Sequence, residues 1–194
     1  MREASVDPVS KPRPGRGFLV FKWAVYALLA LNVALYATHG TLTETFDTAA
    51  WLVLLLLFEW ETGGWSGGSR RRRVAHGARA LASLVIAWAC SDYALQREWL
   101  DFANAATWLA VVAALELEVR VPAGRRRFHH ARRSVTWALY AALVGFIAAW
   151  LVLGSDDVGG AWLDAWDATL WLAAFVVIEL NLFDRAPRSA SAHQ

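Results

Sequence analysis

The chain contains six long stretches of apolar residues that are nearly free of charge, and no other feature constrains its fold as strongly. An apolar helix of about 20 residues is long enough to span about 30 Å of hydrocarbon. Five such runs can be drawn at 17–37, 76–95, 100–120, 134–154 and 162–183, and a shorter sixth covers 46–62. With 57% apolar residues and 12 Trp in 194 residues, a soluble fold of this size could not bury them. The sequence therefore predicts an all-α, polytopic integral membrane protein with six transmembrane helices.

Positive charges lie almost entirely on one side of these segments. Of the 19 Lys and Arg residues, only Arg97 falls in a loop on the opposite side. Cytoplasmic loops of membrane proteins carry such an excess of Lys and Arg. We therefore expect a multi-pass protein of the bacterial inner membrane with both termini in the cytoplasm. We also expect its basic loops to contact anionic lipid headgroups.

Polar residues recur along the chain at fixed spacings. If the six segments are taken as three consecutive pairs, the second segments of the first and second pairs match at a spacing of 57 residues, and those of the second and third pairs match at 63. An outer acid recurs as Glu44, Asp101 and Asp164, and three residues later stand Asp47, Asn104 and Asp167. A tryptophan follows as Trp51, Trp108 and Trp171, and then a glutamate as Glu59, Glu116 and Glu179. The first helices match at a constant spacing of 57, as in Lys22, Arg79 and Thr136 or Tyr36, Tyr93 and Trp150. The pattern predicts one two-helix hairpin repeated three times.

Three parallel hairpins fit most simply around a pseudo-threefold axis along the membrane normal, although a sequential six-helix bundle is also compatible with the pattern. The expected hairpins are 17–62, 76–120 and 134–183. The expected cytoplasmic segments are a disordered tail at 1–16, a Gly/Arg-rich linker at 63–75, a basic loop at 121–133 and a tail at 184–194.

The recurring glutamates are expected to lie inside the apolar slab. Only 11 apolar residues separate each from the outer polar position, which is about 16 Å of helix. Hairpin geometry predicts that Lys22 pairs with Glu59 and that Arg79 pairs with Glu116 or Glu118, whereas Glu179 has no equivalent cation. Three interpretations remain open for these groups: structural ion pairing, proton or cation handling, and snorkelling to the interface.

The outer acids are Glu44, Asp47, Asp101, Asp164 and Asp167. At the starts of the second helices they can cap free amides, and Thr41 with Glu44 fits a capping box. They can also form an acidic mouth that concentrates cations. We expect Trp51, Trp108 and Trp171 to pack between hairpins.

Sequence motifs for cofactors and catalysis are missing. No pair of histidines lies deep in a predicted helix, Cys90 is the single cysteine, and there is no phosphate-binding loop. We expect no cofactor, no metal, no nucleic-acid binding and no enzymatic activity; only His129 and His130 are candidates for a lipid-handling enzyme. The sequence favours a channel or transporter for protons or cations. The alternative is a non-catalytic accessory or assembly subunit that packs its Trp-rich hairpins against a membrane partner or a second copy.

Overall fold

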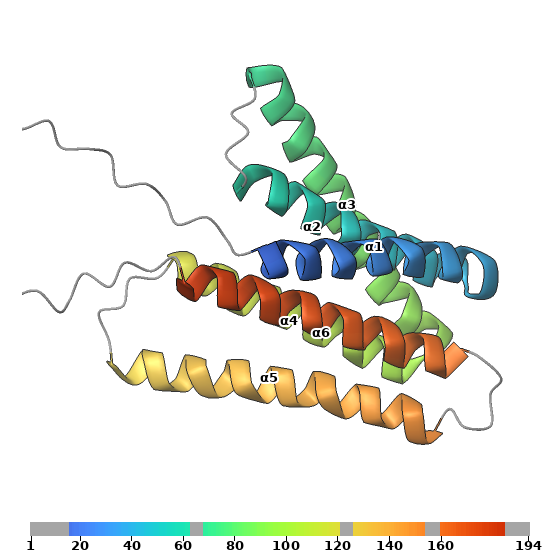
Figure 1. Ribbon diagram of the computed structural model, residues 1–194. Helices are drawn as coiled ribbons and strands as arrows, with labels where there is room; N and C mark the ends of the chain where they lie inside the picture. Colours follow the sequence, from blue (N-terminus) through green and yellow to red (C-terminus); the bar gives the residue numbers. More distant parts are fainter. Residues whose placement is uncertain (1–15, 63–67, 121–125, 154–159, 185–194) are drawn as a thin grey trace, which may run out of the picture.

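Six helices make up the described part of the chain. The computed structural model describes residues 16–62, 68–120, 126–153 and 160–184, with side chains at all of these except 62, 115, 118–120, 126–133, 153 and 176–184. The helices are α1 (Arg16–His39), α2 (Leu42–Thr62), α3 (Ser69–Gln96), α4 (Trp99–Arg120), α5 (Arg126–Leu153) and α6 (Gly160–Asp184) (Figure 1). These ranges contain no strand, so the all-α prediction is confirmed for them.

Two helices begin earlier than predicted. α3 begins at Ser69, inside the stretch 63–75 that was predicted as a linker, and α5 begins at Arg126, inside the predicted loop 121–133. Arginine is a good helix former, so the backbone hydrogen bonds continue past the apolar run into the basic residues. An apolar run predicts only the part of a helix that can lie in lipid, so the observed helices begin earlier than the apolar runs do.

Within the described residues, three helical segments are long and apolar enough to cross a membrane: α1, α3 and Ser134–Val152 of α5. The segment Trp99–Ala114 of α4 is apolar but shorter. α2 is not among these three helices. It carries two carboxyl side chains toward each end: Glu44 and Asp47 at its start, and Glu59 and Glu61 at its end.

The outward surface of these helices is rich in large apolar side chains. Val20 on α1 is 70% exposed, Leu84 on α3 is 68% exposed and Trp137 on α5 is 65% exposed. A soluble monomer rarely leaves so much apolar surface in water. Hydrocarbon is a suitable solvent for this surface.

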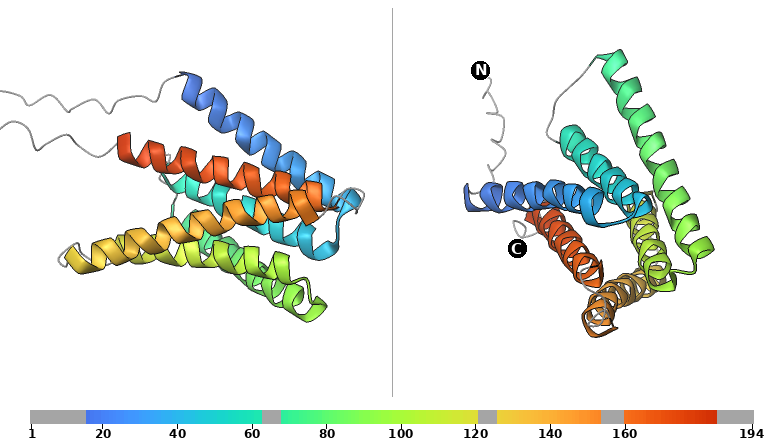
Figure 2. Two further views of the ribbon diagram at one scale, coloured as in Figure 1. Left: turned by 90° about the horizontal axis from the view of Figure 1, so that it is seen from below. Right: turned by 90° about the vertical axis from the view of Figure 1, so that its right-hand side faces the viewer.

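The six helices form a closed ring in sequence order. Each helix packs against the one before it and the one after it, and α1 also packs against α6. α1 runs into α2 and α3 into α4 at the same end of the ring, which we call the turn end. Figures 1 and 2 show that the helices converge at the turn end and diverge toward the other end.

Burial on the odd-numbered helices follows the spacing of 57 residues. Leu29, Ile86 and Leu143 are 0%, 1% and 0% exposed. Nearer the turn end, Tyr36, Tyr93 and Trp150 are 4%, 5% and 6% exposed. Residues at equal positions of α1, α3 and α5 therefore face the inside of the ring together.

The tryptophans of the even-numbered helices pack across the ring. The ring centroids of Trp51 on α2 and Trp171 on α6 are 6.2 Å apart with an edge-to-face orientation, and those of Trp108 on α4 and Phe175 on α6 are 4.9 Å apart. Such aromatic contacts add about 0.5–1.5 kcal/mol to the free energy gained by burial. The predicted packing of these tryptophans between hairpins is confirmed.

Candidate functional site

The turn between α1 and α2 is tight because it contains only Gly40 and Thr41. The Thr41 backbone N–H donates to the carboxylate of Glu44, and the Glu44 backbone N–H donates to Thr41 Oγ1 at 3.2 Å. The capping box predicted from the sequence is confirmed. A Cβ at Gly40 would lie 2.6 Å from Glu44 Oε2 and 2.7 Å from Tyr36 Cδ1, so the turn has no room for a side chain. The turn thereby holds Tyr36 and Glu44 next to each other.

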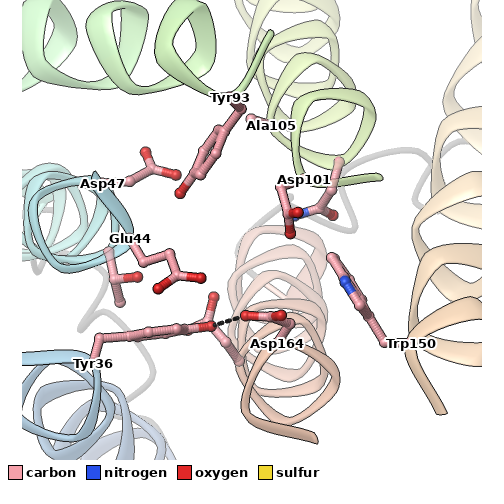
Figure 3. A pocket seen from close by; sticks show the side chains of 11 residues that line it. Tyr36, Glu44, Asp47, Tyr93, Asp101, Ala105, Trp150 and Asp164 are labelled. Atoms are coloured by element: carbon pink, nitrogen blue, oxygen red, sulfur yellow. Dashed lines mark hydrogen bonds between the residues drawn. The ribbon is translucent and has the colours of Figure 1, made fainter. Parts of the chain in front are cut away.

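A cavity with an empty volume of about 350 Å³ lies at the turn end, and all six helices contribute to its lining (Figure 3). The lining contains all five outer acids named from the sequence: Glu44, Asp47, Asp101, Asp164 and Asp167. Asn104 and the aromatic residues Tyr36, Tyr93 and Trp150 complete the matching positions of the three hairpins. Among the described residues, no Lys or Arg lines the cavity.

Hydrogen bonds from α1 to α6 close the ring beside this cavity. Tyr36 Oη donates to Asp164 Oδ1 at 2.8 Å, and Asn32 Nδ2 donates to Asp167 Oδ1 at 2.6 Å. Both donors are buried, Asn32 completely. A buried hydrogen bond contributes about 0.5–1.5 kcal/mol, and about 1.5–3 kcal/mol when its acceptor is charged. These two therefore fix both the ring closure and the orientation of the α6 acids.

The other two odd-numbered helices also direct a polar aromatic side chain toward the cavity. Figure 3 shows Tyr93 beside Asp47, with its hydroxyl group pointing inward, and Trp150 on the side of Asp101. Each odd-numbered helix thus brings a donor toward acids of the even-numbered helix that precedes it around the ring.

Three buried oxygens at or beside the cavity have no hydrogen-bond partner among the described residues. They are Asp47 Oδ1, Asn104 Oδ1 and Asn32 Oδ1. Leaving such an atom unsatisfied costs about 1–3 kcal/mol, so each is a place where a donor or a cation is favoured.

The acids are spread around the cavity and do not converge on one point. Within the described ranges, no three His, Cys, Asp or Glu side chains are close enough together to hold a metal ion. Their negative charge nevertheless extends to the loop: burial, together with the charges of Glu44 and Asp92, raises the pKa of Glu98 between α3 and α4. The arrangement suits protons or hydrated cations better than a dehydrated metal.

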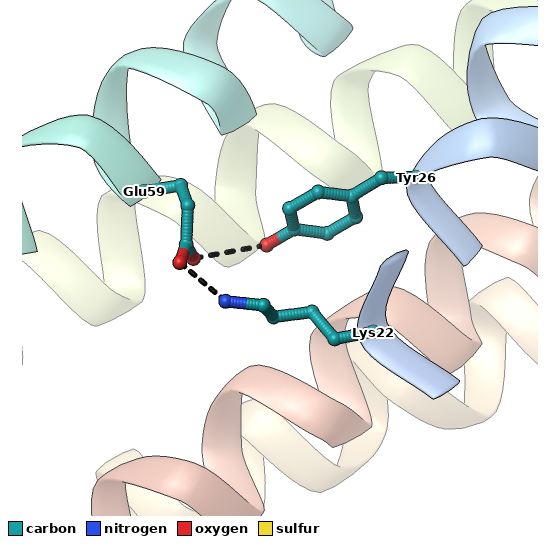
Figure 4. A network of polar contacts seen from close by, with 3 residues as sticks. All are labelled: Lys22, Tyr26 and Glu59. Atoms are coloured by element: carbon teal, nitrogen blue, oxygen red, sulfur yellow. Dashed lines mark hydrogen bonds and ion pairs between the residues drawn. The ribbon is translucent and has the colours of Figure 1, made fainter. Parts of the chain in front are cut away.

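A second polar group lies between α1 and α2 toward the other end of the ring. Lys22 Nζ forms an ion pair with Glu59 Oε1, and Tyr26 Oη donates to Glu59 Oε2 at 3.3 Å (Figure 4). The side chains of Lys22 and Glu59 are 10% and 28% exposed. The predicted Lys22–Glu59 pair is present, and its charges are largely removed from solvent.

The partner of Arg79 differs from the prediction. Arg79 Nη2 lies 2.8 Å from Glu61 Oε2 of the preceding hairpin, whereas Glu116 or Glu118 was predicted. Glu59 and Glu61 lie on opposite sides of α2, which packs against both α1 and α3. Because Glu59 faces α1, Glu61 faces α3 and meets Arg79 there.

The other predicted intramembrane positions are less completely described. Glu116 lies on the exposed side of α4, and Thr136 is half-buried on α5. Glu179 belongs to α6, but its side chain and that of Glu118 lie outside the described residues, as do those of His129 and His130.

Comparison with known protein families, curated proteins and solved structures finds no match for this chain.

Asn32, Gly40 and the three aromatic residues of the cavity were not predicted as site residues, although the sequence carries a signal for each. Asn32 is the one amide in the first apolar run, Gly40 precedes a capping box, and Tyr36, Tyr93 and Trp150 stand at a constant spacing from one another.

Replacing Lys22 by methionine should lower the free energy of unfolding by about 3 kcal/mol, because Glu59 keeps a partly buried charge without its cation. The double variant Lys22→Met/Glu59→Gln should recover most of this loss. Arg79→Met is the matched control, with a loss below about 1 kcal/mol, because its pair is exposed. Unfolding in detergent measures all three, and equal losses in the two single variants would contradict the assignment.

Replacing Asp101 by asparagine should raise the free energy of unfolding by about 1 kcal/mol, because one of five like charges leaves the cavity while an acceptor oxygen remains. Glu61→Gln, the same chemical change away from the cavity, should give no gain. Melting temperatures in detergent at neutral pH test this, and an unchanged or lower value for Asp101→Asn argues against mutual repulsion.

Proposed function

We propose that this chain is a non-catalytic, multi-pass membrane transport protein that moves protons or small cations, with six crossings built from three copies of one hairpin. The observation that carries the proposal is the cavity lined by five acids and by no Lys or Arg, at the point where six helices converge. Stability alone does not favour collecting like charges in a place of low dielectric. Such an arrangement is typical of a site that attracts positive charge.

The threefold composition of the cavity and of the core supports the repeat. Three acids at one position, three polar residues at the next and three aromatic residues on the facing helices all line the same space. Leu29, Ile86 and Leu143 are the matching buried positions of the odd-numbered helices. A repeat that diverged freely would not keep equal burial at equal positions.

The positions of the charges support six crossings. Nearly all of the Lys and Arg residues lie in the tails, the linkers and the helix parts next to them. This distribution favours the cytoplasm for the end away from the turns and the outside for the turn end. In this orientation the acidic cavity is an outer mouth of an inner-membrane protein. In the same orientation, the Lys22–Glu59 pair lies toward the cytoplasmic end.

The apolar core below the cavity favours a gated or alternating route over an open pore. Leu29, Val111 and Leu143 belong to one buried cluster and are at most 1% exposed. A cation leaving the cavity toward the cytoplasm meets this cluster. Transport therefore requires a change in packing, and the described arrangement corresponds to a closed state.

Flux into proteoliposomes tests the proposal. The vesicles contain a pH-sensitive dye, and a membrane potential is imposed. The luminal pH should then change faster in vesicles that contain the wild-type protein than in empty vesicles. Asp164→Asn and Asp101→Asn should lower the rate roughly tenfold, because they weaken the attraction for positive charge. Glu61→Gln is the control and should keep the wild-type rate.

Repeating the assay with K⁺, Na⁺ or choline as the external cation separates proton movement from metal-cation movement. Background flux for wild type with every cation would overturn the proposal. If the purified chain then carried a stoichiometric membrane partner, the accessory-subunit interpretation would replace it.

A further inference from the structure

α1 differs from the other odd-numbered helices because polar residues run along its buried face. Lys22, Tyr26, Asn32 and Tyr36 are all less than 9% exposed, at spacings that keep them on one side of a helix. Tyr36 lines the acidic cavity, and Tyr26 and Lys22 contact Glu59 toward the other end. The buried polar face of α1 thus connects the two polar groups of the protein.

Asn32 is the middle member of this face. It is 0% exposed, and its Nδ2 donates to Asp167 at 2.6 Å. Its Oδ1 is buried without a hydrogen-bond partner. The matching residues of α3 and α5 are Ala89 and Phe146, which offer no polar atom. Among these three matching positions, α1 alone therefore carries an unsatisfied buried acceptor.

Leu29 interrupts the polar face between Asn32 and Tyr26. It is 0% exposed and belongs to the same buried cluster as Tyr26 and Leu143. Asn32 and Tyr26 are six residues apart, which is about 9 Å along the helix axis. Hydrogen-bonded oxygens lie about 2.8 Å apart, so two or three water molecules would bridge this gap.

We infer, on the basis of the proposed function, that the transported cation is the proton and that it crosses along the buried face of α1. Water held at Asn32 Oδ1 forms the first step, and Leu29 is the barrier. The proton leaves a carboxyl group of the cavity, passes through water to the Glu59 carboxylate and is released to solvent. No other bond is made or broken.

The chemistry of this face favours a proton over a metal cation. Asn32 and Tyr26 each present a single oxygen, and a dehydrated metal ion needs several at once. Lys22 stands at the end of the route, where its charge would repel a metal ion. A proton instead needs only a chain of hydrogen bonds, and Glu59 accepts it directly.

Leu29→Ala in the proteoliposome assay tests the route. The space it creates borders Asn32 Oδ1 and Tyr26, so water can enter it, whereas a cavity with apolar walls stays dry. Proton flux should rise roughly tenfold, the change that a barrier lowered by about 1.4 kcal/mol produces. Ile86→Ala is the matched control: Ile86 is equally buried at the same position of α3 but packs among Ala50, Ala82, Val85 and other apolar residues. Its flux should stay at the wild-type level.

Asn32→Leu should reduce proton flux to the background of empty vesicles. Because this variant also removes a hydrogen bond to Asp167, the double variant Asn32→Leu/Leu29→Ala is compared with Leu29→Ala at equal amounts of folded protein. The double variant should lose the added flux.

The route is wrong if Leu29→Ala and Ile86→Ala change flux equally, or if the double variant keeps the added flux. It is also wrong if the Leu29→Ala flux depends on K⁺ or Na⁺ and not on the pH gradient. These results would leave the proposed transport function standing, since flux is still present. Background flux in wild type and in Leu29→Ala alike would contradict both the route and the function.

Discussion

Polar groups inside a ring of apolar helices must find their partners within the ring, and this requirement determines how the helices are joined. Lys22 and Glu59 hold α1 to α2, and Tyr36 and Asn32 hold α1 to α6 through Asp164 and Asp167. In a low-dielectric surrounding, a group without a partner is penalised by several kcal/mol. The polar contacts therefore select one arrangement of the helices, and the apolar contacts fill the space that remains.

At the cavity of the turn end, some of these polar groups lack a hydrogen-bond partner. Five carboxyl groups share the cavity at the turn end, and two of its lining residues, Asp47 and Asn104, leave an oxygen unpartnered. Inside the ring, the described helices pack closely, with Leu29, Ala89 and Leu143 at 0% exposure. Natural proteins keep local destabilisation of this kind at sites that act on something else. The contrast between the packed core and the acidic cavity is the reason that we assign function to the latter.

The amino-acid pattern predicted the all-helical architecture, the capping box at Thr41 and Glu44, and the Lys22–Glu59 pair. These follow from local spacing and from the equal depth of residues within one hairpin. The contact of Arg79 with Glu61 was not predicted, because hairpin geometry relates residues within one hairpin, whereas α2 has a neighbour on each side. Asn32 was missed for a related reason: its partner Asp167 is 135 residues away, and no local periodicity relates the two.

Ring closure also has a consequence for how the chain reaches its folded state. α1 is synthesised first, yet the acids that accept hydrogen bonds from Asn32 and Tyr36 are on α6, at sequence separations of 135 and 128 residues. Until α6 has been synthesised, those two side chains lack these acceptors. The ring therefore closes only when α6 reaches α1. A chain truncated after α4 would lack the contact between α1 and α6 that closes the ring.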